Sequence, residues 1–332
     1  MASSVNYVEA LIDGDRPSQR GGHSAVTADN QIVIFGGSSY LENGRFAYMN
    51  DTYVLDAKSR AWHKVPCSGE HPSARYGHSV ELVGSRMFVF GGRGPSGVLR
   101  DTFFLDLVEW TWVPVSVTSA SPAPRFFHAS LLVGRKIVVH GGWDGRTTCL
   151  GDLWVFNTDS FTWLQPRTVG LAPSPRYGHT LELLNDGRIL CFGGASVTTK
   201  DPVPQYYNDL RSLDTETMVW TKPPVGGDLA PSGRYGMRSA QLEEGVVFYG
   251  GWGVGGIQNA HCKRKNAGSV HLLRVGTDHD PQMSWLRPTL PAAPPAHKYG
   301  HTMTVIGATL YIFGGWNGKQ ACNDLIELSL TH

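Results

Sequence analysis

Five histidines that recur along the chain are the side chains most able to do chemistry. Each stands three residues after a basic residue, and the set is His23, His78, His128, His179 and His301. Imidazole is a common zinc ligand, so converging histidines could hold a metal ion. Such a site needs three or four ligand atoms within about 2.0–2.3 Å of the ion, whereas equivalent residues of successive repeats stand apart. We therefore expect structural, hydrogen-bonding histidines, no metal and no other cofactor.

The histidines belong to a signature that occurs six times. Clear copies are Arg75-Tyr-Gly-His78 and Arg176-Tyr-Gly-His179, whereas Arg234-Tyr-Gly-Met237 has lost the histidine. Downstream of each copy, a short apolar run ends in a glycine pair: Gly36-Gly37, Gly91-Gly92, Gly141-Gly142, Gly193-Gly194, Gly250-Gly251 and Gly314-Gly315. The pairs recur at nearly regular intervals along the whole chain, as the units of one repeat do. Such runs are typical of strands buried on both faces, and paired glycines suit crowded backbones.

Each unit is expected to contain four antiparallel strands. Alternating residues after the signature predict an inner strand, which a glycine-containing turn joins to the buried strand. An aspartate opens a third strand, at Asp51, Asp101, Asp152, Asp209 and Asp324. A tryptophan marks a fourth, at Trp62, Trp112, Trp163, Trp220 and Trp285. This pattern predicts an all-β, six-bladed β-propeller, with tryptophans between blades and the repeated Arg and Asp as strand caps and ion pairs.

The last unit lacks its own fourth strand. The tryptophan of one unit precedes the histidine of the next by an interval that is the same from Trp62 to His78 and from Trp112 to His128. Counting back this interval from His23 reaches Tyr7. We therefore expect the segment around Tyr7 to complete the last blade, which also removes open sheet edges. The expected single propeller, residues 1–332, has blades near 16–66, 71–116, 121–167, 172–224, 230–289, and 294–330 plus 4–12.

The composition narrows the classes of function. With 29 Lys+Arg against 28 Asp+Glu, the chain has no broad basic field, so we expect no nucleic-acid binding. No apolar run is long enough to span a membrane, and the N-terminal residues do not resemble a signal peptide. The five cysteines are scattered and odd in number, which suits free thiols in a reducing compartment. We expect a cytoplasmic, monomeric propeller without a further domain.

The glycine pair, the downstream aspartate and the tryptophan at blade spacing resemble the Kelch repeat. The resemblance covers essentially all of residues 5–330, and six copies in register make it specific. Blade five departs most, with Met237 in place of histidine, an insertion after Gly251, and Ser269 where the third strand should open with aspartate. Loops that vary on a constant sheet are expected where loops carry function.

The resemblance implies a candidate binding surface, which we call the collar. In Kelch propellers the loops between strands four and one and between strands two and three open onto one face, around the mouth of the channel. Residues after the signature's basic residue would supply Tyr76, Phe126, Tyr177, Tyr235 and Tyr299. Residues after the glycine pairs would supply Arg93, Trp143, Trp252 and Trp316, with Arg100, Arg146 and Lys319 further along. Trp, Tyr and Arg dominate binding hot spots, although some of these rings could instead fill the channel or pack between blades.

Three insertions follow glycine pairs and point to the same face. They span residues 38–50, 195–208 and 252–268, and the last contains the basic residues His261, Lys263, Arg264 and Lys265. This run is either a solvated charged segment or a basic lip that attracts an acidic partner.

Two classes of function remain open. The first is a protein–protein interaction module, an adaptor or effector, whose collar binds a short acidic or carboxylate-bearing segment of another protein. The alternative is a Kelch-type enzyme acting on a small anionic metabolite, similar to sugar-acid epimerases or metal-dependent lyases of this fold. A lyase-type iron site would need Glu-x3-Asp-x3-His, but the segments Glu9–Pro17 and Glu182–Leu190 end without histidine. We expect binding rather than catalysis, with no catalytic residues.

Overall fold

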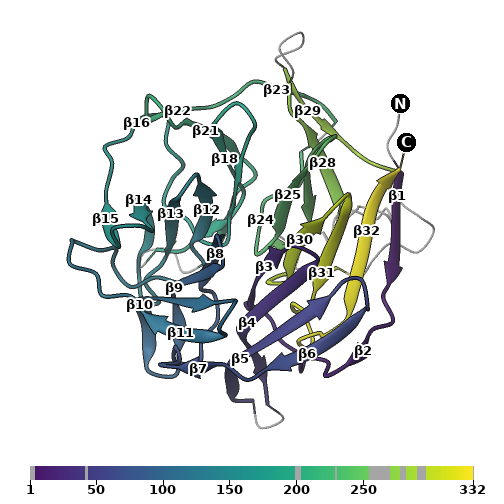
Figure 1. Cartoon of the computed structure of the whole chain (residues 1–332). Coiled ribbons are helices and arrows are strands. Elements are labelled where there is room, and N and C mark those ends of the chain that lie inside the picture. Colours follow the sequence, from purple (N-terminus) through teal and green to yellow (C-terminus); the bar gives the residue numbers. More distant parts are fainter. Residues whose placement is uncertain are drawn as a thin grey trace.

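The structure, a computed structural model, describes residues 4–41, 44–198, 203–228, 230–253, 270–276, 282–289 and 297–331. Within these ranges the chain forms strands and no helices, and six sheets stand around one axis (Figure 1). No helix among these residues is long and apolar enough to cross a membrane. The expected six-bladed, all-β propeller is confirmed.

Each blade is built from four antiparallel strands, which follow chain order from the inside outward except in the last blade, where the N-terminal strand is the outer one. The inner strands are β3 (Ser24–Ala28), β8 (Ser79–Val83), β12 (Ala129–Val133), β17 (Thr180–Leu183), β25 (Arg238–Leu242) and β30 (Thr302–Ile306). The second strands are β4 (Gln31–Tyr40), β9 (Arg86–Gly94), β13 (Lys136–Trp143), β18 (Arg188–Phe192), β26 (Gly245–Tyr249) and β31 (Thr309–Phe313). These second strands carry the apolar runs, and their residues pack against the neighbouring blades on both sides, which explains their burial on both faces.

The third and outer strands complete the blades. The third strands are β5 (Phe46–Asp56), β10 (Gly97–Asp106), β14 (Cys149–Asn157), β21 (Leu210–Asp214), β28 (Val270–Arg274) and β32 (Leu325–Thr331). The outer strands are β6 (Ala61–Val65), β11 (Thr111–Pro114), β15 (Thr162–Leu164), β22 (Val219–Thr221), β29 (Met283–Leu286) and, in the last blade, β1 (Ser4–Glu9).

Four blades gain a short parallel edge strand that the sequence pattern did not predict. These are β2 (Asp13–Gly14), β7 (Ser68–Gly69), β16 (Val169–Gly170) and β23 (Val225–Gly227). Each belongs to the segment that leads into the next inner strand. Two further pairs lie at the loops: β19 (Ala195–Ser196) with β20 (Gln205–Tyr206), and β24 (Arg234–Tyr235) with β27 (Trp252–Gly253).

The glycine pairs allow neighbouring blades to approach closely. Gly36 and Gly37 have φ angles of 66° and 109°, in the region that side chains disfavour. A Cβ atom on Gly36 would lie 2.8 Å from the carbonyl oxygen of Arg75 in the next blade. The N–H of the second glycine donates to that same carbonyl at 2.8 Å. The same bond recurs between every pair of neighbouring blades: Gly92 to Arg125, Gly142 to Arg176, Gly194 to Arg234, Gly251 to Lys298 and Gly315 to Arg20.

A second circle of backbone hydrogen bonds surrounds the axis. The residue before each signature histidine or Met237 donates its N–H to its counterpart in the preceding blade at 2.7–2.8 Å. The circle runs through Gly22, Gly77, Phe127, Gly178, Gly236, Gly300 and back to Gly22. We call it the backbone ring. It narrows one end of the channel to six backbone groups.

Tryptophans fill the gaps between blades, as predicted. Trp62, Trp112 and Trp220 are at most 2% exposed. Each repeated tryptophan packs on the aromatic residue that precedes the previous blade's glycine pair; the ring centroids of Phe35 and Trp112, for example, lie 4.7 Å apart. The hydrophobic core is therefore a set of clusters between blades, because each sheet buries both faces against its neighbours.

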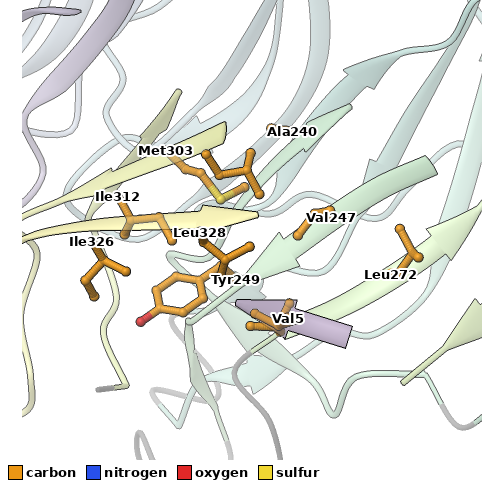
Figure 2. Close-up of a cluster of buried hydrophobic side chains, with 11 residues drawn as sticks. Val5, Ala240, Val247, Tyr249, Leu272, Met303, Ile312, Ile326 and Leu328 are labelled. Atoms are coloured by element: carbon orange, nitrogen blue, oxygen red, sulfur yellow. The ribbon is translucent and has the colours of Figure 1, made fainter. Parts of the chain in front are cut away.

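The N-terminal strand closes the propeller in the predicted register. Strand β1 pairs antiparallel with β32, and both ends of the chain lie together in Figure 1. Tyr7 stands opposite Leu328, just as Trp62 stands opposite Leu55. Val5 is 5% exposed and belongs to a buried cluster with Tyr249 and Leu328 (Figure 2).

Removing residues 1–12 is expected to lower the free energy of unfolding by about 5 kcal/mol or more, because burial of Val5, Tyr7 and Ala10 and one strand pairing are lost. Urea denaturation measures the change. Val5→Asp should also destabilise strongly, whereas Asn6→Asp, on the exposed side of the same strand, should change stability little. A truncated chain that melts with the full-length chain would contradict this role for β1.

Candidate functional site

The repeated basic and acidic residues form structural ion pairs. Five of the six signature bases reach the aspartate that opens their own blade's third strand, with N–O distances of 2.6–2.8 Å: Arg20–Asp51, Arg75–Asp101, Arg125–Asp152, Arg176–Asp209 and Lys298–Asp324. The Arg75 guanidinium also donates to the carbonyl of Gly91 at 3.0 Å. These bonds fix the loop before the inner strand to the rest of the blade, as expected for caps.

The signature histidines hold neighbouring blades together. Nε2 of His78 lies 2.7 Å from the hydroxyl of Ser24, and Nε2 of His128 lies 2.8 Å from that of Ser79. His23 bonds Thr302 in the same way at 3.0 Å. In each case the hydroxyl is the first residue of the preceding blade's inner strand. Burial lowers the pKa of His78 well below its ordinary value, so the ring is neutral and serves as a hydrogen-bonding group.

His179 forms its hydrogen bond with another histidine instead of a hydroxyl. Ala129 offers His179 no hydroxyl, and His140, which replaces the aromatic residue of other blades, supplies its Nδ1 at 3.0 Å instead. The ligand atoms of His140, His179 and Cys191 all lie within 4.8 Å of one another, so these residue types could hold a metal. Burial raises the pKa of the Cys191 thiol to about 12, which disfavours the thiolate that binds metals. The histidine–histidine bond accounts for this cluster, and the absence of a metal stays a prediction.

In every blade the two loops of the collar are joined by backbone pairing between one residue of each loop. The backbones of Tyr76 and Arg93 exchange hydrogen bonds of 2.9 and 3.0 Å, and Phe126 pairs with Trp143 in the same way. Equivalent pairs are Gly21–Ser38, Tyr177–Ala195, Tyr235–Trp252 and Tyr299–Trp316. All six blades therefore present the residue after the signature base beside the residue after the glycine pair.

The collar residues differ in exposure. Tyr76, Phe126, Tyr177 and Trp316 are buried. Tyr235, Tyr299, Arg93, Trp143 and Trp252 are partly buried. Arg100, Arg146 and Lys319 are exposed. The buried rings contact one another around the axis, for example Tyr76 with Phe126 at 5.9 Å and Tyr177 with Tyr235 at 5.4 Å. The Arg93 guanidinium lies 5.7 Å from the Phe126 ring centroid.

Phe127 is a member of this aromatic cluster that the sequence interpretation missed. It occupies the backbone ring at a φ of 52°, where the other five blades have glycine. A positive φ is costly for a bulky side chain, and the cost is offset by contacts with Tyr76 at 5.5 Å and Tyr177 at 6.5 Å. The signal in the sequence was Phe in place of glycine.

The insertion in blade one raises further aromatic side chains above the collar. Tyr40 and Phe46, on β4 and β5, are 56% and 37% exposed, and their tilted rings are in contact with centroids 4.2 Å apart. The Phe46 ring lies parallel to the Tyr76 ring at 6.0 Å, so this exposed pair continues the collar outward. The basic lip at residues 261–265 lies outside the described residues.

A cavity of about 480 Å³ lies on the other side of the backbone ring. It follows all six inner strands from His78, His128 and His179 away from the collar, and no collar residue lines it. Its walls carry three charged side chains, Glu81, Glu182 and Arg238, among serines and threonines. The sequence interpretation considered Glu182 only as part of an incomplete iron motif and did not single out Glu81 or Arg238. The available signal was a charged residue on an inner strand where other blades have a hydroxyl or apolar side chain.

The two cavity carboxyls have raised pKa values. Burial, together with the charge of the neighbouring Glu182, raises the pKa of Glu81 to about 7, and a hydrogen bond from Ser130 opposes this rise. That bond measures 2.5 Å. Burial likewise raises the pKa of Glu182 to about 7, opposed by a hydrogen bond with Ser239. Both groups therefore change charge near neutral pH.

Replacing both residues, Glu81→Gln and Glu182→Gln, is expected to change how stability depends on pH. The pKa of each carboxyl is higher in the folded chain than in the unfolded chain. The two groups therefore cost no stability below about pH 4.5, where both states are protonated, and lower the free energy of unfolding increasingly as the pH rises to about 7. The variant should lack this loss and gain about 1–3 kcal/mol over the wild type between pH 5 and pH 8. Urea denaturation at both pH values tests this. The surface variant Glu109→Gln should follow the wild type, and parallel profiles for the double variant would contradict the assignment.

The comparisons with known proteins agree with this geometry. The KLHDC2/KLHL20/DRC7 Kelch-repeats domain matches residues 3–194 and 205–332. A Rho GTPase-activating protein, gacHH, of Dictyostelium discoideum is 34% identical over 61% of the chain. Host cell factor of Drosophila melanogaster is 28% identical over 91%, and acyl-CoA-binding domain-containing protein 4 of Arabidopsis thaliana is 31% identical over 92%. The chain covers 10%, 16% and 46% of these proteins, less than half of each. Six blades in register, closed by the N-terminal strand, and this family match show that the chain belongs to the Kelch-repeat family.

Proposed function

We propose that this Kelch propeller is a protein-interaction module whose collar face binds a short acidic or carboxylate-bearing segment of a partner protein. The observation that carries the proposal is the pairing of the two loops in all six blades. It gathers aromatic and basic side chains from distant parts of the sequence on one face. The relatives include a Rho GTPase-activating protein, whose name refers to another protein, and host cell factor.

The chemistry of the face favours an anionic segment. Arg100, Arg146 and Lys319 are exposed on the loops after three glycine pairs and form no ion pair with any described residue. Exposed cations steer an acidic partner and accelerate its association. The partly buried rings of Trp143 and Trp252 and the exposed pair Tyr40–Phe46 offer apolar contact area beside these charges.

The four described cysteines are free thiols, which fits the reducing conditions of the cytoplasm. We therefore propose that the propeller acts there as a monomeric adaptor or effector.

Reversing the three exposed charges, Arg100→Glu, Arg146→Glu and Lys319→Glu, is expected to weaken binding of acidic peptides by about tenfold or more. An array of short peptides that are acidic, neutral or basic, each with a free and an amidated C-terminus, supplies the ligands. Fluorescence polarisation then gives the affinities. Binding of the wild type should favour acidic and free-carboxylate members and weaken as salt is added.

A matched triple variant, Lys58→Glu, Lys136→Glu and Arg274→Glu, changes the same net charge at exposed positions away from the collar. It should bind like the wild type. An equal loss of affinity in both triple variants would show that only the net charge of the protein matters and would contradict binding at the collar. A wild type that shows no preference for acidic or carboxylate-bearing peptides would refute the proposed ligand class.

A further inference from the structure

The inner strand of blade five begins with a residue unlike those of the other blades. The equivalent first residues are Ser24, Ser79, Ala129, Thr180 and Thr302, all small. Blade five has Arg238, which lines the central cavity. A guanidinium inside a propeller needs an anionic partner or water, because an unpaired buried charge is costly.

The side chain of Arg238 is partly exposed and forms no hydrogen bond or ion pair with any residue that the structure describes, whereas five of the six signature bases have an aspartate. Burial lowers the pKa of Arg238, and no carboxylate opposes that effect. Burial lowers the pKa of His23, His78 and His301, and the positive charge of Arg238 contributes in the same direction to each. Arg238 is the first residue of β25 and follows Met237, which stands at the position of the signature histidines, so it lines the cavity at its floor, the end nearest the backbone ring.

The two acidic residues of the cavity also lack a basic partner. Glu81 and Glu182 are the third residues of their inner strands, and each meets a serine of the next blade, Ser130 or Ser239. No basic group lowers the pKa of either carboxyl. They stand two residues further along the strands than Arg238, which corresponds to about 6.6 Å along the channel. The cavity thus presents one cation at its floor and two carboxyls higher on its wall.

From this arrangement we infer that the central cavity binds a small zwitterion, with its carboxylate at Arg238 and its ammonium group at Glu81 and Glu182. A guanidinium binds a carboxylate through two parallel hydrogen bonds, and carboxylates accept from ammonium. The offset between the charged levels favours an extended ω-amino acid over an α-amino acid, whose two charges are adjacent. A cavity of about 480 Å³ accommodates a molecule of this size.

Arg238 takes the place of a hydroxyl residue, and this replacement removes a hydrogen bond between two blades. By analogy with His78 and Ser24, His301 should bond the first residue of strand β25, but that residue is Arg238, and no hydrogen bond joins the two side chains. Both ring nitrogens of His301 are buried without a partner among the described residues. Blade five therefore gives up a hydrogen bond between blades in order to place a cation in the cavity.

Isothermal titration calorimetry of the full chain with 5-aminopentanoate, pentanoate and pentylamine tests the inference. The wild type should bind 5-aminopentanoate at least about tenfold more tightly than either analogue with a single charge. Arg238→Thr, which restores the hydroxyl of other blades, should weaken 5-aminopentanoate binding by about tenfold or more, and so should the pair Glu81→Gln and Glu182→Gln. The exposed-residue control Arg274→Thr should bind like the wild type.

Stability separates loss of the site from loss of the fold. Arg238→Thr should melt about 1–3 °C above the wild type, because the new hydroxyl reaches His301. Failure of all three probes to bind saturably at millimolar concentration overturns the inference, as does tight binding that Arg238→Thr leaves unchanged. Neither result depends on the collar, which lies on the other side of the backbone ring.

Discussion

The close approach of neighbouring blades at the glycine pairs is the constraint on which the rest of the structure depends. Both glycines adopt positive φ angles, and a Cβ on either would meet backbone or histidine atoms at less than 3 Å, as at Gly36 and Gly37. Because neither residue has a Cβ, the N–H of the second glycine can reach the carbonyl of the next blade. This bond places that blade's signature base where it meets its aspartate, and its histidine where it meets the preceding strand. One local backbone conformation thus sets strand, loop and blade spacing together.

The backbone ring divides the axis of the propeller into two environments. On one side lie the aromatic rings of the collar, packed against one another, and on the other lies the polar cavity. The division follows from sequence order, because each signature runs from a collar residue such as Tyr76 through a ring residue, Gly77, to an inner-strand histidine, His78. A substitution on one side therefore leaves the chemistry of the other side in place. This makes two separate binding surfaces compatible with one narrow axis.

The repeat predicted most of the fold because each unit carries its own strand signals and the interval from tryptophan to histidine is local. Tyr7 was placed opposite the last third strand from that interval alone, and its pairing with Leu328 confirms it. The collar was harder to predict. Residue type identified Tyr76 and Phe126, but their burial depends on contacts between blades, which no single unit encodes. The cavity was missed for the same reason. The charge of Arg238 is visible in the sequence, whereas its lack of a partner emerges only when six strands surround it.

Two blades depart from the repeat in different ways. In blade three a second substitution restores the lost hydrogen bond, whereas in blade five none among the described residues does. Ala129 removes a hydroxyl, and His140 restores the hydrogen bond to His179, so blade three keeps its connection to blade four. Blade five shows no such repair among the described residues: Met237 replaces a histidine, and Arg238 leaves His301 without a partner. Structural substitutions in a packed repeat tend to be balanced, since an unsatisfied buried group weakens the fold. An uncompensated loss in combination with an unpaired cation therefore points to selection for something other than stability at this position.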